Sequence, residues 1–529
     1  MEGSDSQENK NITEVTTFPV PFALKEIQGN ITITTNSPYK PSKEKIINHA
    51  IQCHQTGEIS EAIKHYQYCL KQGFMDPRVL CNYGSILKDL GKLKEAEKVQ
   101  RKAIEINSDF AECHYNLGNT LKDLGKLKEA KLSILKAIEL KPDLAEAHSN
   151  LGNILRDLGN LKEAKLSTLK AIELKPNLAE AHSNLGNIFL DLGKVKEAEL
   201  CQRKAIEIKP NFANAHSSLG SILKDIGNLK EAELCQRKAI KIKPNFANAH
   251  SNLGEILRDL GKLKEAELTL KKAIELDSNL ACAYFSISRL KYSNNNIKWK
   301  NQLFSKDILK NKLIKDQIDL YFARSNILHN EKQYKESSKY LQLAHKLKLE
   351  INSSKPDKLI EKSQVLLVES KKKEINEKEY FQSPESIFIV GMFRSGTTLS
   401  ESILSINLSV DDLGECNILE QSFLESIKID QSLTLAELYW KKARQYTNEL
   451  KITTNKWIYN YQYAGIIASR IPNSKIIHCY RHPLDNILSL YRTYFSTGTG
   501  VEYFSSLVDC AKVYLNQEEI MTEYKKRFR

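Results

Sequence analysis

Hydrophobic and polar residues follow a pattern that returns every 34 residues through the first half of the chain. One unit, residues 145–178, reads AEAHSNLGNILRDLGNLKEAKLSTLKAIELKPNL. Its apolar positions recur at helical spacing, Gly159 interrupts the run in the middle, and Pro176 ends it. Because glycine and proline mark helix ends, each unit is predicted to form two antiparallel helices.

The period is kept through seven units by two series of small residues. The glycines are Gly57, Gly91, Gly125, Gly159, Gly193, Gly227 and Gly261, and the alanines are Ala62, Ala96, Ala130, Ala164, Ala198, Ala232 and Ala266. The pattern resembles the tetratricopeptide repeat (TPR). In the unit quoted above, the family's marker positions are occupied by Leu151, Gly152, Leu155, Ala164, Ala171 and Pro176. The resemblance implies an α-helical TPR superhelix of seven units over residues 43–280, followed by degenerate or capping helices over 281–352.

An asparagine occupies the sixth position of most units, with Ser218 interrupting the series. These residues are Asn82, Asn116, Asn150, Asn184 and Asn252. In TPR arrays the first helix lines the concave groove, so the resemblance implies an asparagine ladder there. Asparagine can both donate to and accept from a peptide backbone, which suits capture of a protein or peptide. The alternative is recent repeat duplication, with asparagine a neutral surface residue.

The segments that flank the repeats have other compositions. Residues 1–42 lack periodicity and are rich in Asn, Thr and Ser, so we expect them to be disordered. Residues 353–383 are rich in Lys and Glu and are predicted to be a charged, partly helical linker. A second domain is predicted over residues 384–529.

The second domain begins with the most informative local motif, IFIVGMFRSGTTL at 387–399. An apolar strand runs into a loop bracketed by Gly391 and Gly396, and a helix follows. This order is typical of a loop whose backbone N–H groups bind phosphate or sulfate. The glycine spacing is that of a Walker A loop, but Thr397 replaces its lysine, which argues against a P-loop kinase or nucleotide hydrolase. The cation of the loop is Arg394, whose guanidinium suits oxyanions.

A second segment, KIIHCY at 475–480, is predicted to be a buried strand. Arg481 follows it, Pro483 suits the first turn of a helix, and Ser489 lies on that helix. Together the two motifs resemble the 5′-phosphosulfate loop and the 3′-phosphate motif of sulfotransferases that use 3′-phosphoadenosine 5′-phosphosulfate (PAPS). The pattern is most similar to bacterial sulfotransferase domains joined to TPR arrays and to tyrosylprotein sulfotransferases. The resemblance implies an α/β, P-loop-like, three-layer domain.

The resemblance also implies roles for individual residues. Glu415 matches the catalytic glutamate, and Lys456 matches the lysine that contacts the transferring sulfuryl group. The residues expected to bind the donor are Arg394, Ser395, Gly396, Thr397, Thr398, Arg481 and Ser489. A desolvated Glu415 near an anionic donor would have a raised pKa and could act as base, while Lys456 and Arg394 would stabilise the developing charge. The family uses no metal.

Some features of the domain leave alternatives open. His478 and His482 are rival bases, although His478 lies in an apolar strand and is predicted to be a satisfied core histidine. Phe393 stands where the family usually has proline. The sequence ends at Arg529, about 145 residues after the domain boundary, whereas such a domain needs about 200, so we expect it to be shortened at its C-terminus.

Composition adds constraints on partners and compartment. The net charge of +13 suits anionic ligands. The ten cysteines are scattered, with no CxxC pair, so we do not expect a zinc site. We expect the protein to reside in a reducing compartment. No apolar run is long enough to span a bilayer, and we expect a cytoplasmic protein. We expect no nucleic-acid partner, and homo-oligomerisation is left open.

These observations favour a sulfotransferase that transfers a sulfuryl group from PAPS to a hydroxyl of a protein, peptide or glycan recruited by the groove. One alternative is a non-catalytic TPR adaptor with a degenerate sulfotransferase domain. Another is a repeat-linked glycosyltransferase, but the second domain is too short for two nucleotide-sugar domains.

Overall fold

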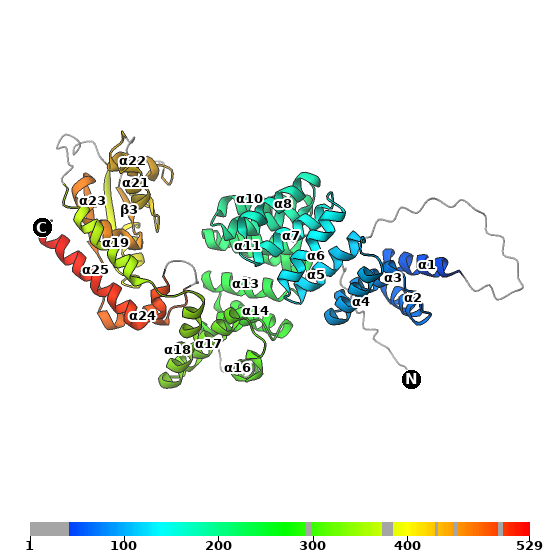
Figure 1. Cartoon of the computed structure of the whole chain (residues 1–529). Coiled ribbons are helices and arrows are strands. Elements are labelled where there is room, and N and C mark those ends of the chain that lie inside the picture. Colours follow the sequence, from blue (N-terminus) through cyan, green and yellow to red (C-terminus); the bar gives the residue numbers. More distant parts are fainter. Residues whose placement is uncertain are drawn as a thin grey trace, which may run out of the picture. The chain divides into compact units, whose positions relative to one another are not determined.

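The computed structural model describes residues 42–290, 298–372, 384–428, 432–447, 452–495 and 501–528 (Figure 1). The chain forms two compact units, Met1–Leu276 and Asp277–Arg529. The segment predicted to be disordered, 1–42, lies outside the described residues except for Ser42. The Ser42 hydroxyl caps the first helix by accepting a hydrogen bond from Lys45 N at 3.3 Å.

The first unit consists of seven antiparallel helix pairs, which confirms the predicted TPR superhelix (Figure 1). The pairs are α1 (Lys43–Gln55) and α2 (Ile59–Lys71), α3 (Pro77–Asp89) and α4 (Leu93–Ile106), α5 (Ala111–Asp123) and α6 (Leu127–Leu140), α7 (Ala145–Asp157) and α8 (Leu161–Leu174), α9 (Ala179–Asp191) and α10 (Val195–Ile208), α11 (Ala213–Ile226) and α12 (Leu229–Ile242), and α13 (Ala247–Asp259) and α14 (Leu263–Leu276).

Small residues let the two helices of a pair approach closely. A Cβ on Gly152 of α7 would lie 3.0 Å from the carbonyl oxygen of Ala164 on α8 and closer still to the Thr168 hydroxyl. Ala164 and Ala171 are fully buried between the helices. Gly159 has a φ of 82° at the turn, a conformation that glycine adopts without the steric cost of a side chain. The repeated glycines and alanines are therefore packing and turn requirements.

The second unit carries the remaining described elements. Its helices are α15 (Ala281–Ser288), α16 (Lys298–Phe304), α17 (Ile314–Asn330), α18 (Tyr334–Ile351), α19 (Pro356–Glu369), α20 (Thr397–Leu404), α21 (Ile418–Ser426), α22 (Leu435–Ala443), α23 (Ala464–Arg470), α24 (Pro483–Arg492) and α25 (Leu507–Arg527), with short 3₁₀ helices η1 (Asp307–Leu309), η3 (Ile458–Tyr463) and η4 (Glu502–Ser505). Its strands are β1 (Glu385–Val390), β2 (Val410–Asp412), β3 (Ile452–Asn455) and β4 (Ser474–His478).

The four strands form one parallel sheet in the order β2-β3-β1-β4. Phe388 of β1 pairs with Asn455 of β3 on one side and Ile476 of β4 on the other. The prediction of a buried strand at 475–480 is wrong in part, because β4 lies at the sheet edge in the described region. Its side chains alternate in exposure, and Ile477 remains 37% exposed.

The core of the second unit forms between the sheet and the helices around it. Phe388 and Val390 of β1 are fully buried together with Tyr439 of α22 and Ile466 of α23. Leu366 of α19 belongs to the same core, although α19 lies in the segment predicted to be a charged linker. The apolar face of this helix is therefore part of the second unit's packing.

Helices α17 and α18 form the antiparallel pair expected of a further degenerate repeat, and they pack against α24. Phe322 and Leu341 share a buried cluster with Tyr491 of α24. The Nε2–H of His345 donates to the carbonyl oxygen of Tyr491 at 2.6 Å. Burial lowers the pKa of His345 to about 4, so this imidazole is neutral at pH 7.

The buried His345 should make the second unit less stable in mild acid. As the pH falls below 6.5, the usual histidine pKa, the unfolded chain gains a proton that the folded state does not take up until about pH 4. Stability from this group is complete above pH 6.5 and is lost as the pH falls towards 4. Between pH 7 and pH 5, the free energy of unfolding of the wild type should fall by about 2 kcal/mol more than that of His345→Gln, at about 1.4 kcal/mol per pKa unit.

Urea unfolding followed by tryptophan fluorescence measures this effect, because Trp299, Trp440 and Trp457, the chain's three tryptophans, all lie in the second unit. His482→Gln, at an exposed histidine, is the matched control. Equal pH dependence in the wild type and His345→Gln would contradict the prediction.

Candidate active site

The loop after β1 has the geometry of an anion-binding turn. β1 ends at Val390 and α20 begins at Thr397, as the sequence predicts. Arg394 (φ 68°) and Gly396 (φ 101°) both adopt left-handed backbone conformations. Such turns gather successive backbone N–H groups on one side, where they join the unpaired N–H groups of the first turn of α20.

Gly391 is required by a close approach of two backbones. A Cβ at this position would lie 2.5 Å from the carbonyl oxygen of Cys479 and 2.7 Å from the Ser395 hydroxyl. The ends of β1 and β4 are held together here, since Cys479 N donates to the Val390 carbonyl at 2.8 Å. Any larger residue would push the loop away from the end of β4.

Helix α24 ties the loop to the second predicted motif. Asn486 Nδ2 donates to the carbonyl of Phe393 at 2.9 Å, and Arg481 Nη1 donates to the carbonyl of Arg394 at 3.1 Å. Arg394 Nε in turn donates to the Ser489 hydroxyl at 3.3 Å. The structure therefore brings together Arg394, Arg481 and Ser489, although about 90 residues separate the two motifs. Both guanidiniums are exposed.

Phe393, where the family usually has proline, fixes the loop in another way. Its ring packs edge-on against Phe504, Phe495 and Tyr459, with centroid distances of 4.9, 5.9 and 6.0 Å. Aromatic contacts of this geometry are favourable beyond the apolar area they bury. The loop is thus anchored by a side chain instead of by a constrained proline backbone.

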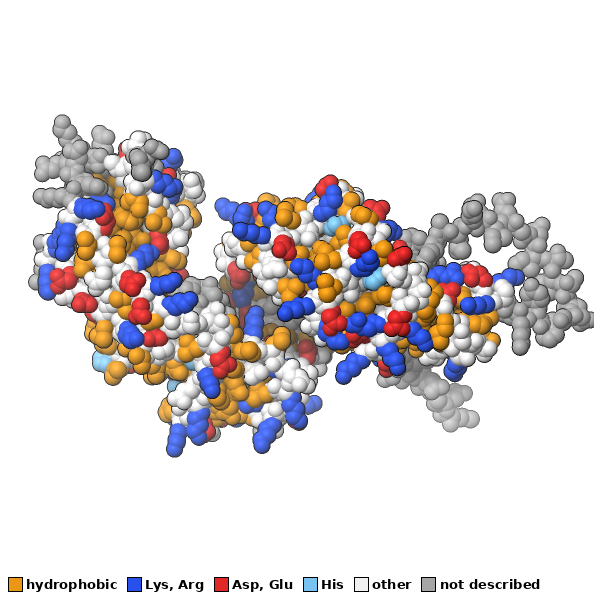
Figure 2. Space-filling view, in the orientation of Figure 1, with side chains coloured by type: hydrophobic (Ala, Val, Ile, Leu, Met, Phe, Trp, Pro, Cys, Tyr) orange, Lys and Arg blue, Asp and Glu red, His pale blue; other side chains and the backbone are white. Residues whose placement is uncertain are grey.

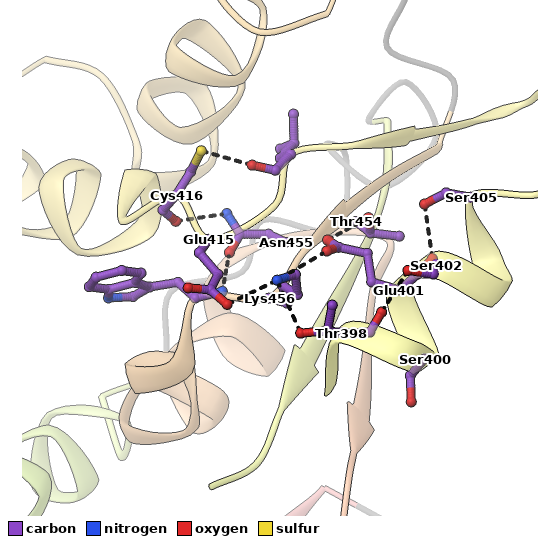
Figure 3. Close-up of polar contacts among 12 residues, drawn as sticks. Thr398, Ser400, Glu401, Ser402, Ser405, Glu415, Cys416, Thr454, Asn455 and Lys456 are labelled. Atoms are coloured by element: carbon purple, nitrogen blue, oxygen red, sulfur yellow. Dashed lines mark hydrogen bonds and ion pairs between the residues drawn. The ribbon is translucent and has the colours of Figure 1, made fainter. Parts of the chain in front are cut away.

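Lys456 reaches from the end of β3 to the first turn of α20 (Figure 3). Its Nζ donates to Glu415 Oε1 at 3.0 Å and to the Thr398 hydroxyl at 3.4 Å, and it lies 3.7 Å from Glu401 Oε2. The lysine is 9% exposed. A buried ammonium needs such partners to offset its lost hydration, and these contacts aim it at the anion-binding loop.

Glu415 is placed by an extension of the β2–β3 pairing. Leu413 N donates to the Thr454 carbonyl at 3.0 Å, and Lys456 N donates to the Gly414 carbonyl at 3.1 Å. The side-chain amide of Asn455 donates to the Cys416 carbonyl at 3.2 Å. The loop that carries Glu415 is therefore held against the strand end that carries Lys456 (Figure 3).

The expectation that Glu415 is desolvated is not met, since its side chain is 51% exposed. The buried carboxylate beside Lys456 is Glu401 of α20, which the sequence analysis missed. Its Oε1 accepts a hydrogen bond from the Thr454 hydroxyl at 3.1 Å. Burial, and then the nearby charge of Asp412, raise the pKa of Glu401, while Lys456 and Thr454 oppose this shift. The sequence held one signal: Glu401 follows Thr397 by four residues, on the same helix face.

The two histidines differ in their surroundings. Burial lowers the pKa of His478 to about 4, and its Nε2 lies 3.8 Å from Glu518. A base with so low a pKa is weak at pH 7. His482 is exposed and precedes α24 as its N-terminal capping residue.

The first helices of the repeats line a groove, and Asn82, Asn116 and Asn150 lie in its lining. Four asparagines of the ladder also donate hydrogen bonds to the preceding first helix. Asn150 Nδ2 donates to the Tyr115 hydroxyl at 3.0 Å and to Asn119 Oδ1 at 2.8 Å. The other contacts are Asn116 to Cys81 Sγ at 3.3 Å, Asn184 to Ser149 Oγ at 3.0 Å and Asn252 to Ser221 Oγ at 3.1 Å. The asparagines therefore also join neighbouring units.

Charges on the repeats are interspersed, as the face in Figure 2 shows. Arg101 and Lys126 pair with Glu97 of α4 at 2.9 and 2.8 Å, and Arg101 also contacts Glu129 of the next unit. Much of the positive charge is thus paired between units. Among the residues that the structure describes, every helix is too short or too polar to cross a membrane.

Comparisons with known proteins agree with this architecture. Sequence models of the tetratricopeptide repeat match residues 84–125, 118–159, 152–193, 179–212, 213–246 and 247–280, and the model described as "Sulfotransferase family" matches residues 420–529. The sulfotransferase match includes Lys456, Arg481 and Ser489, whereas Arg394 and Glu415 precede it.

Individual relatives are more distant. An uncharacterized protein of Aquifex aeolicus (strain VF5) is 30% identical over an alignment of 143 residues, and the match covers 23% of this chain and 19% of that protein. The structure titled "YrrB: a TPR protein with an unusual peptide-binding site" is 27% identical, with a TM-score of 0.27, over 35% of this chain and 96% of that one. The "APC/C hetero-tetramer Cut9-Hcn1" structure is 16% identical, with a TM-score of 0.42, over 48% of this chain and 49% of that one.

The helix pairs, the parallel sheet with its loop and the family matches lead to one description. This chain joins an array of tetratricopeptide repeats to a C-terminal domain of the sulfotransferase family.

Proposed function

We propose that the protein transfers a sulfuryl group from PAPS to a hydroxyl of a protein, peptide or glycan that the TPR groove recruits. The observation that carries the proposal is the meeting of Arg394 and Arg481 on the loop after β1, with Lys456 reaching the adjacent helix start. Three cations around the first turn of a helix suit a donor with a 3′-phosphate and a 5′-phosphosulfate.

The residues fit the donor in a definite order. The loop from Arg394 to Thr398 would bind the 5′-phosphosulfate through backbone N–H groups, and Arg481 with Ser489 would bind the 3′-phosphate. Ser395 supports this fit, since its hydroxyl has no hydrogen-bond partner among the described residues. Neither phosphate contact requires a metal.

The transfer itself would use Glu415 and Lys456. Glu415 is exposed to an arriving acceptor and would take the proton of its hydroxyl as the oxygen attacks sulfur. The S–O bond to the 5′-phosphate breaks, which leaves a sulfate ester and 3′-phosphoadenosine 5′-phosphate (PAP). Lys456 and Arg394 would stabilise the charge that gathers on the departing oxygens. Glu401, buried behind Lys456, would act as a positioning residue.

The thiols support a proposal for the compartment. All ten cysteines lie within the described residues, and all are free. Free thiols, four of them in the buried core of the first unit, suit a reducing environment. We therefore assign the protein to the cytoplasm.

A second function, a non-catalytic adaptor, is favoured by one observation. The sulfotransferase-family match begins at residue 420 and so omits the loop and Glu415. An adaptor would hold its partner through residues 43–280 alone and would have no affinity for PAP.

Calorimetric titration of the full chain with PAP tests the donor site. Arg394→Ala and Arg481→Ala should each weaken PAP binding about 10- to 100-fold, since each removes charge-assisted hydrogen bonds worth about 1.5–3 kcal/mol. Lys475→Ala is the matched control, because it removes a positive charge near the opposite end of β4. Failure of the wild type to bind PAP, or equal affinity in all variants, would refute the donor site and favour the adaptor.

Transfer of radiolabelled sulfate from PAPS to a panel of tyrosine-, serine- and sugar-containing acceptors tests the chemistry. Glu415→Gln should lower kcat about 10²- to 10⁴-fold while PAP affinity is kept, because the variant cannot accept the proton. Glu425→Gln, which removes the half-buried carboxylate of the Lys442 ion pair, should leave kcat unchanged. A Glu415→Gln variant with full activity would exclude this residue as the base.

The groove is tested by capture of an extended acceptor polypeptide on immobilised protein. Replacing Asn116, Asn150 and Asn184 with alanine should reduce capture at least about tenfold, since each lost hydrogen bond is worth about 0.5–1.5 kcal/mol. Lys136, Lys170 and Lys204 have the same spacing on the second helices and, replaced with alanine, form the control. Thermal melts of both triple variants show whether a loss of capture comes from lost contacts with the polypeptide or from weaker packing between repeat units. Unchanged capture by the asparagine variant would refute a binding role for the ladder.

A further inference from the structure

The first helix pair holds a cluster of metal-ligating side chains far in sequence from the sulfotransferase-family domain. His49 and Cys53 lie one helical turn apart on α1, and His65 lies on α2. Their candidate ligand atoms are all within 4.8 Å of one another. The Cys53 Sγ is 3.8 Å from His49 Nε2, and the imidazole centroids of His49 and His65 are 4.7 Å apart.

The other repeats provide an internal reference for these three positions. Residues 34 and 68 positions after His49 are Tyr83 and Leu117, those after Cys53 are Leu87 and Leu121, and those after His65 are Val99 and Ser133. None of the six later units carries a histidine or cysteine at the first two positions. The third position varies and is a cysteine, Cys201 or Cys235, in two later units. Packing of a TPR pair therefore does not require these side chains, and in the first unit alone all three positions carry metal-ligating residues.

The geometry suits a tetrahedral ion. With Zn–N near 2.0–2.1 Å and Zn–S near 2.3 Å, tetrahedral ligands are separated by about 3.3–3.6 Å, so the 3.8 Å between Cys53 and His49 needs little adjustment. The wider separations of the cluster, at most 4.8 Å, must shorten by at most about 1.5 Å, which side-chain rotation of the two histidines can supply. Two imidazole nitrogens and one thiolate are typical zinc ligands. Spacing of four residues on α1 puts two of them on one helix face.

A carboxylate lies beside the cluster. Glu61 precedes His65 by one turn on α2. A hydrogen bond from Lys64 lowers the pKa of Glu61, and the charges of His65 and His49 contribute in the same direction. The Oε1 of Glu61 is paired with Lys64 Nζ at 2.7 Å, so water is the expected fourth ligand.

We propose that His49, Cys53 and His65 bind a Zn²⁺ ion that clamps α1 to α2 at the end of the TPR array. Binding releases the thiol proton of Cys53 and stabilises only the folded pair, because the unfolded chain does not hold the three ligands together. The metal site would also fix one end of the groove, since Ile51, His54 and Gln55 of the same helix line it. The zinc site is independent of the sulfotransferase chemistry.

The test uses the full chain, stripped of metal with a chelator and then titrated with Zn²⁺ against a chromophoric competitor. We expect one ion per chain bound at this site. Titration with Co²⁺ should give visible bands of a tetrahedral ion and a thiolate-to-cobalt charge-transfer band. Cobalt spectra without the thiolate band would overturn the proposal.

The repeat itself supplies variants that should fold. His49→Leu, Cys53→Leu and His65→Ser each install a residue that later units carry at the same position. Each should weaken zinc binding at least about 10- to 100-fold, the loss known for outer-sphere partners alone. Cys201→Ser of α10, which changes a partly exposed cysteine of a later unit, is the control.

Thermal unfolding provides a second readout. Zinc should raise the melting temperature of the wild type and of Cys201→Ser, but not of Cys53→Leu or His65→Ser. The apo variants should melt no lower than the apo wild type, because their new residues already suit the repeat. A zinc-dependent rise that survives in both ligand variants would show that the ion binds elsewhere and would reject the site.

Discussion

The close approach of β1 and β4 at their carboxyl ends is the constraint on which the second unit's site depends. A Cβ at Gly391 would lie 2.5 Å from the carbonyl of Cys479, so the two backbones can meet only because this residue is glycine. The meeting brings Arg481, which follows β4, within hydrogen-bond distance of the loop that follows β1. In open parallel sheets, ligands bind at the carboxyl edge, where the connections of neighbouring strands run to opposite faces of the sheet. Here that place is the carboxyl end of β1, which lies between β3 and β4.

The electrostatics of the site follow from the same sheet. β2 and β3 end side by side, which places Glu415 against Lys456, while α20 carries Glu401 behind the lysine. One ammonium is thus shared between two carboxylates of different exposure. The buried one fixes the position of Lys456, and the exposed one faces solvent.

Features with a local cause could be predicted from the sequence. The 34-residue period, the helix pairs and the strand–loop–helix around Gly391 depend on residue spacing within one segment. Burial depends on neighbours that no local pattern specifies, so the exposure of Glu415, the edge position of β4 and the core role of Leu366 were missed. Glu401 and the His49–Cys53–His65 cluster escaped notice for a related reason. Their partners lie on other helices or strands, and only the fold brings them together.

The asparagine ladder has a mechanical consequence for the TPR array. Its hydrogen bonds join successive first helices along the inner side of the curve. Straightening a curved array lengthens its inner side. These hydrogen bonds would have to stretch or break, so they resist extension of the array. Ser218 replaces the asparagine in one unit, and its shorter side chain leaves a gap in the series. We expect the interior of the array to be most compliant at that unit, so that the groove widens there while its ends keep their curvature.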